Sequence, residues 1–135
     1  MMIQTWAAIL AVMRSRDTAQ ASPEFRRALG GTEALAALIA EGPLASELFG
    51  WTSMFDLCIQ QTETAPYSGP YLRVSPLVSG VVEFRYVDTA KTERQWRRQE
   101  KPAAVIARFE IFICQLGWAS SSPPQGTCSD HGSNV

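Results

Sequence analysis

The sequence predicts an α+β fold, with N-terminal helices, a three-stranded antiparallel meander and a C-terminal helix packed on one face of the sheet. Apolar residues recur at helical spacing near both ends, an alternating pattern occupies the middle, and turns rich in Gly, Pro and Ser separate the segments. The chain has 135 residues, of which 46% are apolar. Residues 1–118 are predicted to form a single domain. Residues 119–135 are rich in Ser, Pro and Gly and are predicted to form a disordered polar tail.

The first helix is predicted over residues 2–14. Trp6, Ile9, Leu10 and Met13 follow helical spacing,. The alternative is a cleaved signal peptide, which the sequence disfavours because its basic residues follow the apolar run instead of preceding it.

A second helix is predicted to begin at Ser22, which can accept a hydrogen bond as a cap, with Pro23 in the first turn. Gly30-Gly31 is predicted to end that helix. Thr32 is then expected to begin a third, short helix that ends at Gly42-Pro43,.

Three strands are predicted in the middle of the chain. The first begins at Trp51 and runs through the alternating residues 54–60, and the second covers Tyr71–Val78,. The third covers Val81–Asp88, with Val82, Phe84 and Tyr86 facing the core and Glu83 and Arg85 facing water. One face of this sheet is therefore expected to be exposed to solvent.

The C-terminal part is predicted to be helical. A basic helix is expected near Thr92–Glu100, and a final helix is expected to follow Pro102, with an apolar stripe that includes Val105, Phe109, Phe112 and Leu116,. Residues 108–116 are apolar on nearly all sides, so a buried strand remains the alternative.

Several common chemistries lack the residues they need. The only histidine, His131, lies in the predicted tail, so imidazole-based catalysis is not expected,. No phosphate-binding glycine loop and no zinc-ligand spacing occur. We therefore expect no cofactor and no metal, and a non-enzymatic role is favoured. Three cysteines, an odd number, are more typical of the cytoplasm than of a disulfide-bonded secreted domain,.

The basic segment is the main charge signal. Residues 91–101 carry five basic and two acidic residues, a net charge of 5 − 2 = +3, whereas the whole chain has −1. On a helix, Arg94, Arg97 and Arg98 would share one side, with Trp96 between them and with help from the nearby Arg85. Arginine beside an aromatic residue suits recognition of carboxylates or phosphates. The alternative is an ordinary solvated face with Trp96 turned to the core.

A second candidate is a polar cluster of Asp56, Glu83 and Arg85. Glu83 and Arg85 lie on one strand face, and Asp56 joins them if the register is suitable. Such a cluster can line a pocket between the sheet and the last helix, although solvated cross-strand ion pairs are the common alternative.

The leading hypothesis is a non-enzymatic, cytoplasmic protein-binding module that recognises an acidic partner surface. In size, mixed α+β order and lack of catalytic residues, the chain is similar to small bacterial immunity or antitoxin proteins, which implies an inhibitor. The alternatives are a small-ligand-binding or enzyme domain that uses the pocket, and RNA binding through residues 91–101. No membrane association is expected, and the sequence specifies no oligomeric state.

Deleting residues 119–135 is predicted to leave the melting temperature unchanged within error. The segment has no periodic apolar residues to offset an ordering cost of about 1–2 kcal/mol per residue. Thermal unfolding of the full chain and of a chain that ends at Trp118 tests this expectation. A clear drop in the shorter chain would show that the tail docks on the domain.

Overall fold

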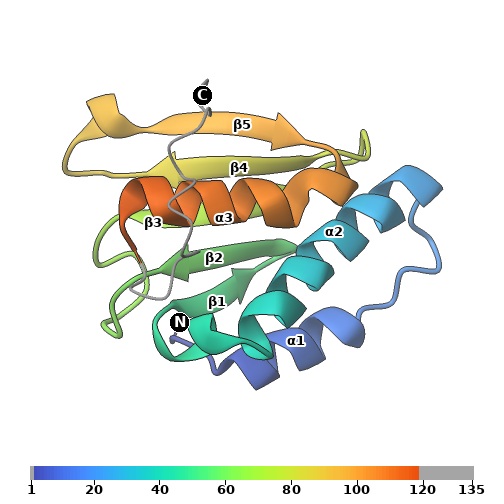
Figure 1. Cartoon of the computed structure of the whole chain (residues 1–135). Coiled ribbons are helices and arrows are strands. Elements are labelled where there is room, and N and C mark those ends of the chain that lie inside the picture. The colour runs from blue at the N-terminus through green and yellow to red at the C-terminus, as the bar shows by residue number, and fades with distance from the viewer. Residues whose placement is uncertain (1, 119–135) are drawn as a thin grey trace.

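A computed structural model describes residues 2–118 and shows helices on one face of a five-stranded antiparallel sheet (Figure 1). The helices are α1 (Trp6–Arg14), α2 (Pro23–Ala40) and α3 (Val105–Leu116), with short 3-10 turns at Pro43–Ser46, Thr92–Arg94 and Pro102–Ala104. The strands are β1 (Phe49–Ser53), β2 (Asp56–Gln60), β3 (Tyr71–Pro76), β4 (Val82–Val87) and β5 (Trp96–Glu100). The α+β class is confirmed, but the sheet has five strands where three were expected. The predicted tail lies outside the described residues.

The start of α2 is as the sequence predicts, but its end is not. Ser22 Oγ accepts a hydrogen bond from the Phe25 N–H at 3.1 Å, and Pro23 occupies the first turn. The helix then continues through Gly30-Gly31, so the predicted break is wrong. A Cβ on Gly31 would lie 3.2 Å from Pro102. Gly31 therefore allows close packing of α2 on the chain that enters α3.

The segment predicted as the first strand is a hairpin of β1 and β2. Trp51 pairs with Cys58 and Ser53 pairs with Asp56, so the chain reverses at residues 54 and 55. Met54 takes the left-handed backbone conformation, with φ at 57°, which glycine or asparagine usually adopts,. Because no such residue marks this turn, the sequence pattern did not indicate it.

The predicted basic helix is also wrong, because most of its length forms edge strand β5. Trp96 lies opposite Tyr86 on β4, and their rings stack with centroids 5.8 Å apart. The Trp96 ring also contacts Phe112 of α3, with centroids 4.4 Å apart. These long-range contacts outweigh the helical spacing of the arginines, since strand formation depends strongly on cross-strand packing.

The core lies between the sheet and the helices. Leu72, Val74, Val82 and Phe84 point from β3 and β4 toward α2 and α3 and are fully buried. Residues 108–116 are helical, so the alternative of a buried strand is excluded. Gly117 ends α3 with φ at 67°, and the Trp118 N–H donates to the Ile113 carbonyl at 3.1 Å.

Phe112→Ala is predicted to lower the free energy of unfolding by about 3–5 kcal/mol, the usual cost of emptying a buried phenylalanine site. Phe112 is 2% exposed and packs edge-on against Phe84 at 5.2 Å between centroids. Urea unfolding measures the change. Gln115→Ala, at an exposed position of the same helix, is expected to stay within about 0.5 kcal/mol,. Equal stability of the two variants would contradict the packing of α3.

Candidate functional site

The face of the sheet turned away from the helices carries a row of three arginines. Arg73 of β3 lies directly opposite Arg85 of β4, and Arg85 lies opposite Arg97 of β5. We call these residues the arginine row. Like charges directly opposite each other on neighbouring strands destabilise a sheet unless other groups compensate them.

The positive charge of Arg73 is well compensated by hydrogen-bonding partners. Its Nε donates to Asp56 Oδ2 at 2.7 Å, its Nη2 donates to Ser53 Oγ at 3.2 Å, and the side chain is only 18% exposed. Burial is the largest single effect on this group and opposes the positive charge. The bond to Asp56 and the other polar contacts of Arg73 together outweigh burial and raise the pKa of Arg73 above its ordinary value,. Arg73 is therefore a satisfied, structural arginine.

The positive charges of Arg85 and Arg97, nearer the β5 edge, are compensated less well. Arg85 Nε lies 3.7 Å from Glu83 Oε1, and Arg97 Nη1 lies 3.7 Å from Glu83 Oε2. Both distances exceed that of a good hydrogen bond, and Arg85 Nε is buried without a hydrogen-bond partner,. One carboxylate is thus shared between two guanidinium groups, and the Arg97 side chain is 69% exposed.

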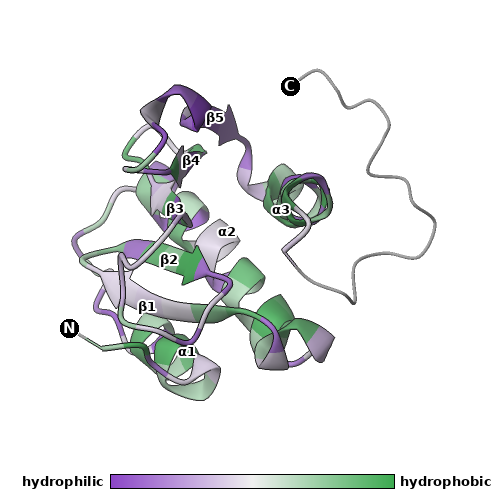
Figure 2. Ribbon diagram, turned by 90° about the vertical axis from the view of Figure 1, so that its left-hand side faces the viewer, coloured by the Kyte–Doolittle hydropathy of each residue, from purple (hydrophilic) through white to green (hydrophobic). Residues whose placement is uncertain are grey.

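An aromatic cluster covers the other end of this face. Trp51 of β1 is fully buried, and its ring contacts those of Tyr67 and Tyr71 at 4.9 and 5.6 Å between centroids. Within the arginine row, the exposed fraction of the side chain rises from 18% at Arg73 to 69% at Arg97, and β5 is coloured as a strongly hydrophilic strand in Figure 2.

Cys58 lies on this face, next to Arg73 in the sheet register, and is fully buried with a free thiol. Burial raises the pKa of Cys58 to about 12, although Arg73 and Arg85 favour the thiolate. At neutral pH the thiol stays protonated, so it is not an activated nucleophile.

The structure divides the predicted binding residues between the two faces. Arg85 and Arg97 lie on the open face, whereas Trp96 and Arg98 point to the helical side, and Arg94 lies in the 3-10 turn before β5. Arg98 Nε donates to Glu100 Oε2 at 2.6 Å. Glu100 also accepts from Arg108 Nε of α3 at 2.9 Å. Glu100 therefore links β5 to α3, and Arg98 is paired with an acidic residue of its own strand.

The residues of the predicted polar cluster do lie on one face of the sheet, but they do not line the expected pocket between the sheet and the last helix. Glu83 and Arg85 contact each other, and Asp56 lies two strands away, bonded to Arg73. All three face away from α3. The hollow between β5 and α3 is lined by Trp96, Arg97, Arg98, Phe112 and Gln115 instead.

Arg73 was not among the candidates from the sequence. A usable signal was present, because arginine occupies an outward position in each of three consecutive strands. It becomes visible only once β5 is recognised as a strand.

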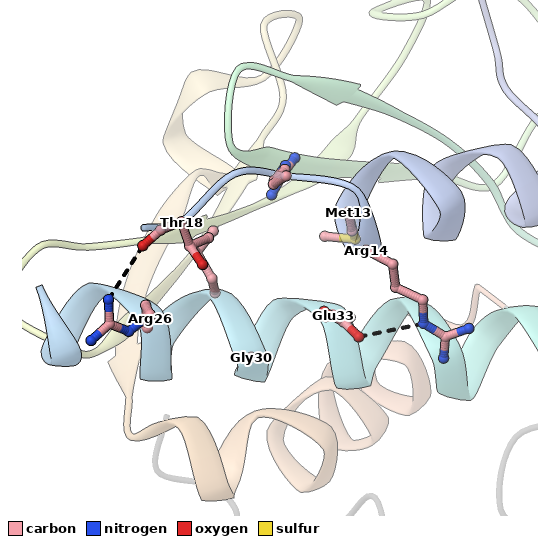
Figure 3. Close-up of a pocket in the computed structure, with 8 residues that line it drawn as sticks. Met13, Arg14, Thr18, Arg26, Gly30 and Glu33 are labelled. Carbon is pink, nitrogen blue, oxygen red and sulfur yellow. Dashed lines mark hydrogen bonds and ion pairs between the residues drawn. The ribbon is translucent and has the colours of Figure 1, made fainter. Parts of the chain in front are cut away.

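A second group of arginines surrounds a hollow of about 220 Å³ between the end of α1 and α2 (Figure 3). Arg26 Nη1 donates to the carbonyls of Thr18 and Ala21 at 3.2 and 2.7 Å, and Arg14 Nε donates to Glu33 at 3.4 Å. Arg16, whose pKa is lowered by burial, donates to the carbonyl of Met54 at 3.2 Å. The bonds of Arg16 and Arg26 hold the linker between the helices in place, and the bond of Arg14 joins α1 to α2.

Residues 2–118 contain no group of three or more His, Cys, Asp or Glu placed to hold a metal ion. In the same part of the chain, no helix is both long and apolar enough to cross a membrane. Comparison with known proteins found no matching family model, curated protein or solved structure.

Stability is predicted to fall above about pH 9. The unfolded Cys58 thiol loses its proton near its ordinary pKa of 9.0, whereas the folded thiol keeps it until about pH 12. The unfolded state then binds fewer protons, so the free energy of unfolding falls by at most about 1.4 kcal/mol per pH unit for this group.

Urea unfolding at a series of pH values tests this expectation. Cys58→Ala should flatten the decline just above about pH 9, before the tyrosines titrate. Burial also raises the pKa of Tyr71 and Tyr86, which leaves a decline at higher pH in both proteins. An identical decline in the variant would show that Cys58 ionises equally well in the folded state.

Proposed function

We propose that this chain is a non-enzymatic, cytoplasmic protein-binding module that recognises an acidic partner surface with Arg85 and Arg97. One observation carries the proposal, namely that both guanidinium groups share the single carboxylate of Glu83 at 3.7 Å. Their remaining N–H groups are available to carboxylates of a partner, which arginine binds in a planar, often bidentate geometry.

A protein fits this surface better than a nucleic acid. The accessible arginines stand beside the carboxylate of Glu83, and the whole chain has a net charge of −1. Phosphate backbones favour a larger basic footprint with a strong dependence on salt. An immunity- or antitoxin-like inhibitor is one kind of module that would use such a surface, because inhibitors of this class act by binding and need no catalytic groups.

Arg97→Glu is predicted to leave the fold intact and to weaken partner binding by about 2 kcal/mol or more. Most of the side chain is in water, so the stability change should stay within about 0.5 kcal/mol,. Reversing the charge adds repulsion from an acidic partner to the loss of attraction.

The test is affinity capture from the native host, with mass spectrometry comparing proteins captured by the wild type and by Arg97→Glu. Arg27→Glu makes the same charge reversal at an exposed position on α2 and serves as the control. Acidic proteins captured by the wild type and the control but lost with Arg97→Glu support the proposal. Recovery of the same proteins in the same amounts with Arg97→Glu contradicts it, and captured RNA in their place favours the nucleic-acid alternative.

A further inference from the structure

The two edges of the sheet are closed to different degrees. At the β1 edge, the N-terminal segment forms a bridge from Gln4 to Gly50, and Gln4 Oε1 accepts the Thr52 N–H at 2.8 Å. At the opposite edge, β5 pairs with β4 only, and within residues 2–118 no other strand lies beside it. An edge strand presents unpaired N–H and C=O groups that can pair with an added strand.

A hollow of about 280 Å³ lies beside β5 on the helical side of the sheet. Its lining includes the Trp96 and Phe112 rings and the exposed side chain of Gln115 on α3. Trp96 is only half-buried despite its contacts with Tyr86 and Phe112. An apolar or aromatic side chain from a neighbouring strand would fill this space and cover the Trp96 ring.

A second hollow, of about 420 Å³, lies at the same end of the strand and is lined in part by the open-face residues Arg85, Val87 and Arg97. Trp96 and Arg97 line both hollows. Side chains of a strand alternate between the two faces of a sheet. A strand added beside Trp96 and Arg97 would therefore place successive side chains in the two hollows in turn.

We propose that β5 accepts an extended segment of the acidic partner as a sixth strand. Apolar side chains of that segment enter the hollow beside Trp96, and the intervening acidic side chains lie against Arg97 and Arg85. Main-chain hydrogen bonds supply affinity in this mode of recognition, and the alternating side chains supply specificity. This inference rests on the proposed function, because it specifies the form in which the acidic partner binds.

The net positive charge around β5 favours binding of an acidic segment over pairing with a second copy of this chain. Residues 91–101 carry a net charge of 5 − 2 = +3, and the edge strand itself holds Arg97 and Arg98. Two copies of this segment would carry the same net positive charge, so they would repel each other. Charged residues ordinarily protect an edge strand from pairing, but the same charges attract a strand of opposite sign.

Two synthetic peptides of equal composition test the proposal. In the first, aspartate alternates with phenylalanine or valine. In the second, the aspartates form one block and the apolar residues another. We expect the alternating peptide to bind the full-length chain at least about tenfold more tightly by fluorescence anisotropy, with slower hydrogen exchange at the β5 amides.

Substitutions in the chain test where the peptide binds. Gln115→Trp fills the helical-side hollow from an exposed position, and Ala107→Trp adds the same side chain elsewhere on the exposed surface of α3. Gln115→Trp and Arg97→Glu are each expected to weaken binding about tenfold or more, whereas Ala107→Trp and Arg27→Glu should change it less than about twofold.

Equal binding of the two peptides, unchanged exchange at the β5 amides, or no binding of either peptide at about 1 mM would overturn the sixth-strand proposal. Dependence of host-protein capture on Arg97 would then still support an acidic partner that docks on the arginine row without strand addition. Loss of that dependence overturns the proposed function itself, so the two failures are distinguishable.

Discussion

Alternation of side chains along five antiparallel strands is the constraint on which both faces of this molecule depend. On β4, Val82, Phe84 and Tyr86 are buried under the helices, and the intervening Glu83 and Arg85 stand on the open face. A shift of one residue in register would exchange the two sets and bury charge in the core. The register that builds the core therefore also aligns the arginine row across three strands.

Elements with complete local signals could be predicted from the sequence. The start of α2 combines a capping serine with a proline in the first turn, and β4 alternates without interruption. The final helix has an apolar stripe and a glycine that ends it at residue 117. In each case the residues that specify the element are neighbours in the chain, so local physical rules suffice.

The missed elements depend on contacts between distant parts of the chain. β5 is a strand because Trp96 packs on Tyr86 and Phe112, and neither contact can be inferred from the spacing of the arginines. Gly31 lies inside α2 because Pro102 approaches it closely, although glycine is usually a signal for the end of a helix,. The candidate site was therefore only partly predictable. Glu83 and Arg85 follow from β4 alone, whereas Arg73 and Arg97 join them through the sheet register.

The electrostatics of the arginine row also explain why we expect partner binding at its β5 end, where Arg85 and Arg97 lie. Three like charges in register are unfavourable, and Asp56 offsets the inner one with a short, partly buried bond,. At the outer end, Glu83 is shared and contacts both guanidinium groups only loosely. A purely structural network would be expected to end in a satisfied arginine, as it does at Arg73. The excess positive charge instead lies beside β5, where the sheet also leaves backbone groups unpaired. A single acidic strand would neutralise that charge and pair with those backbone groups.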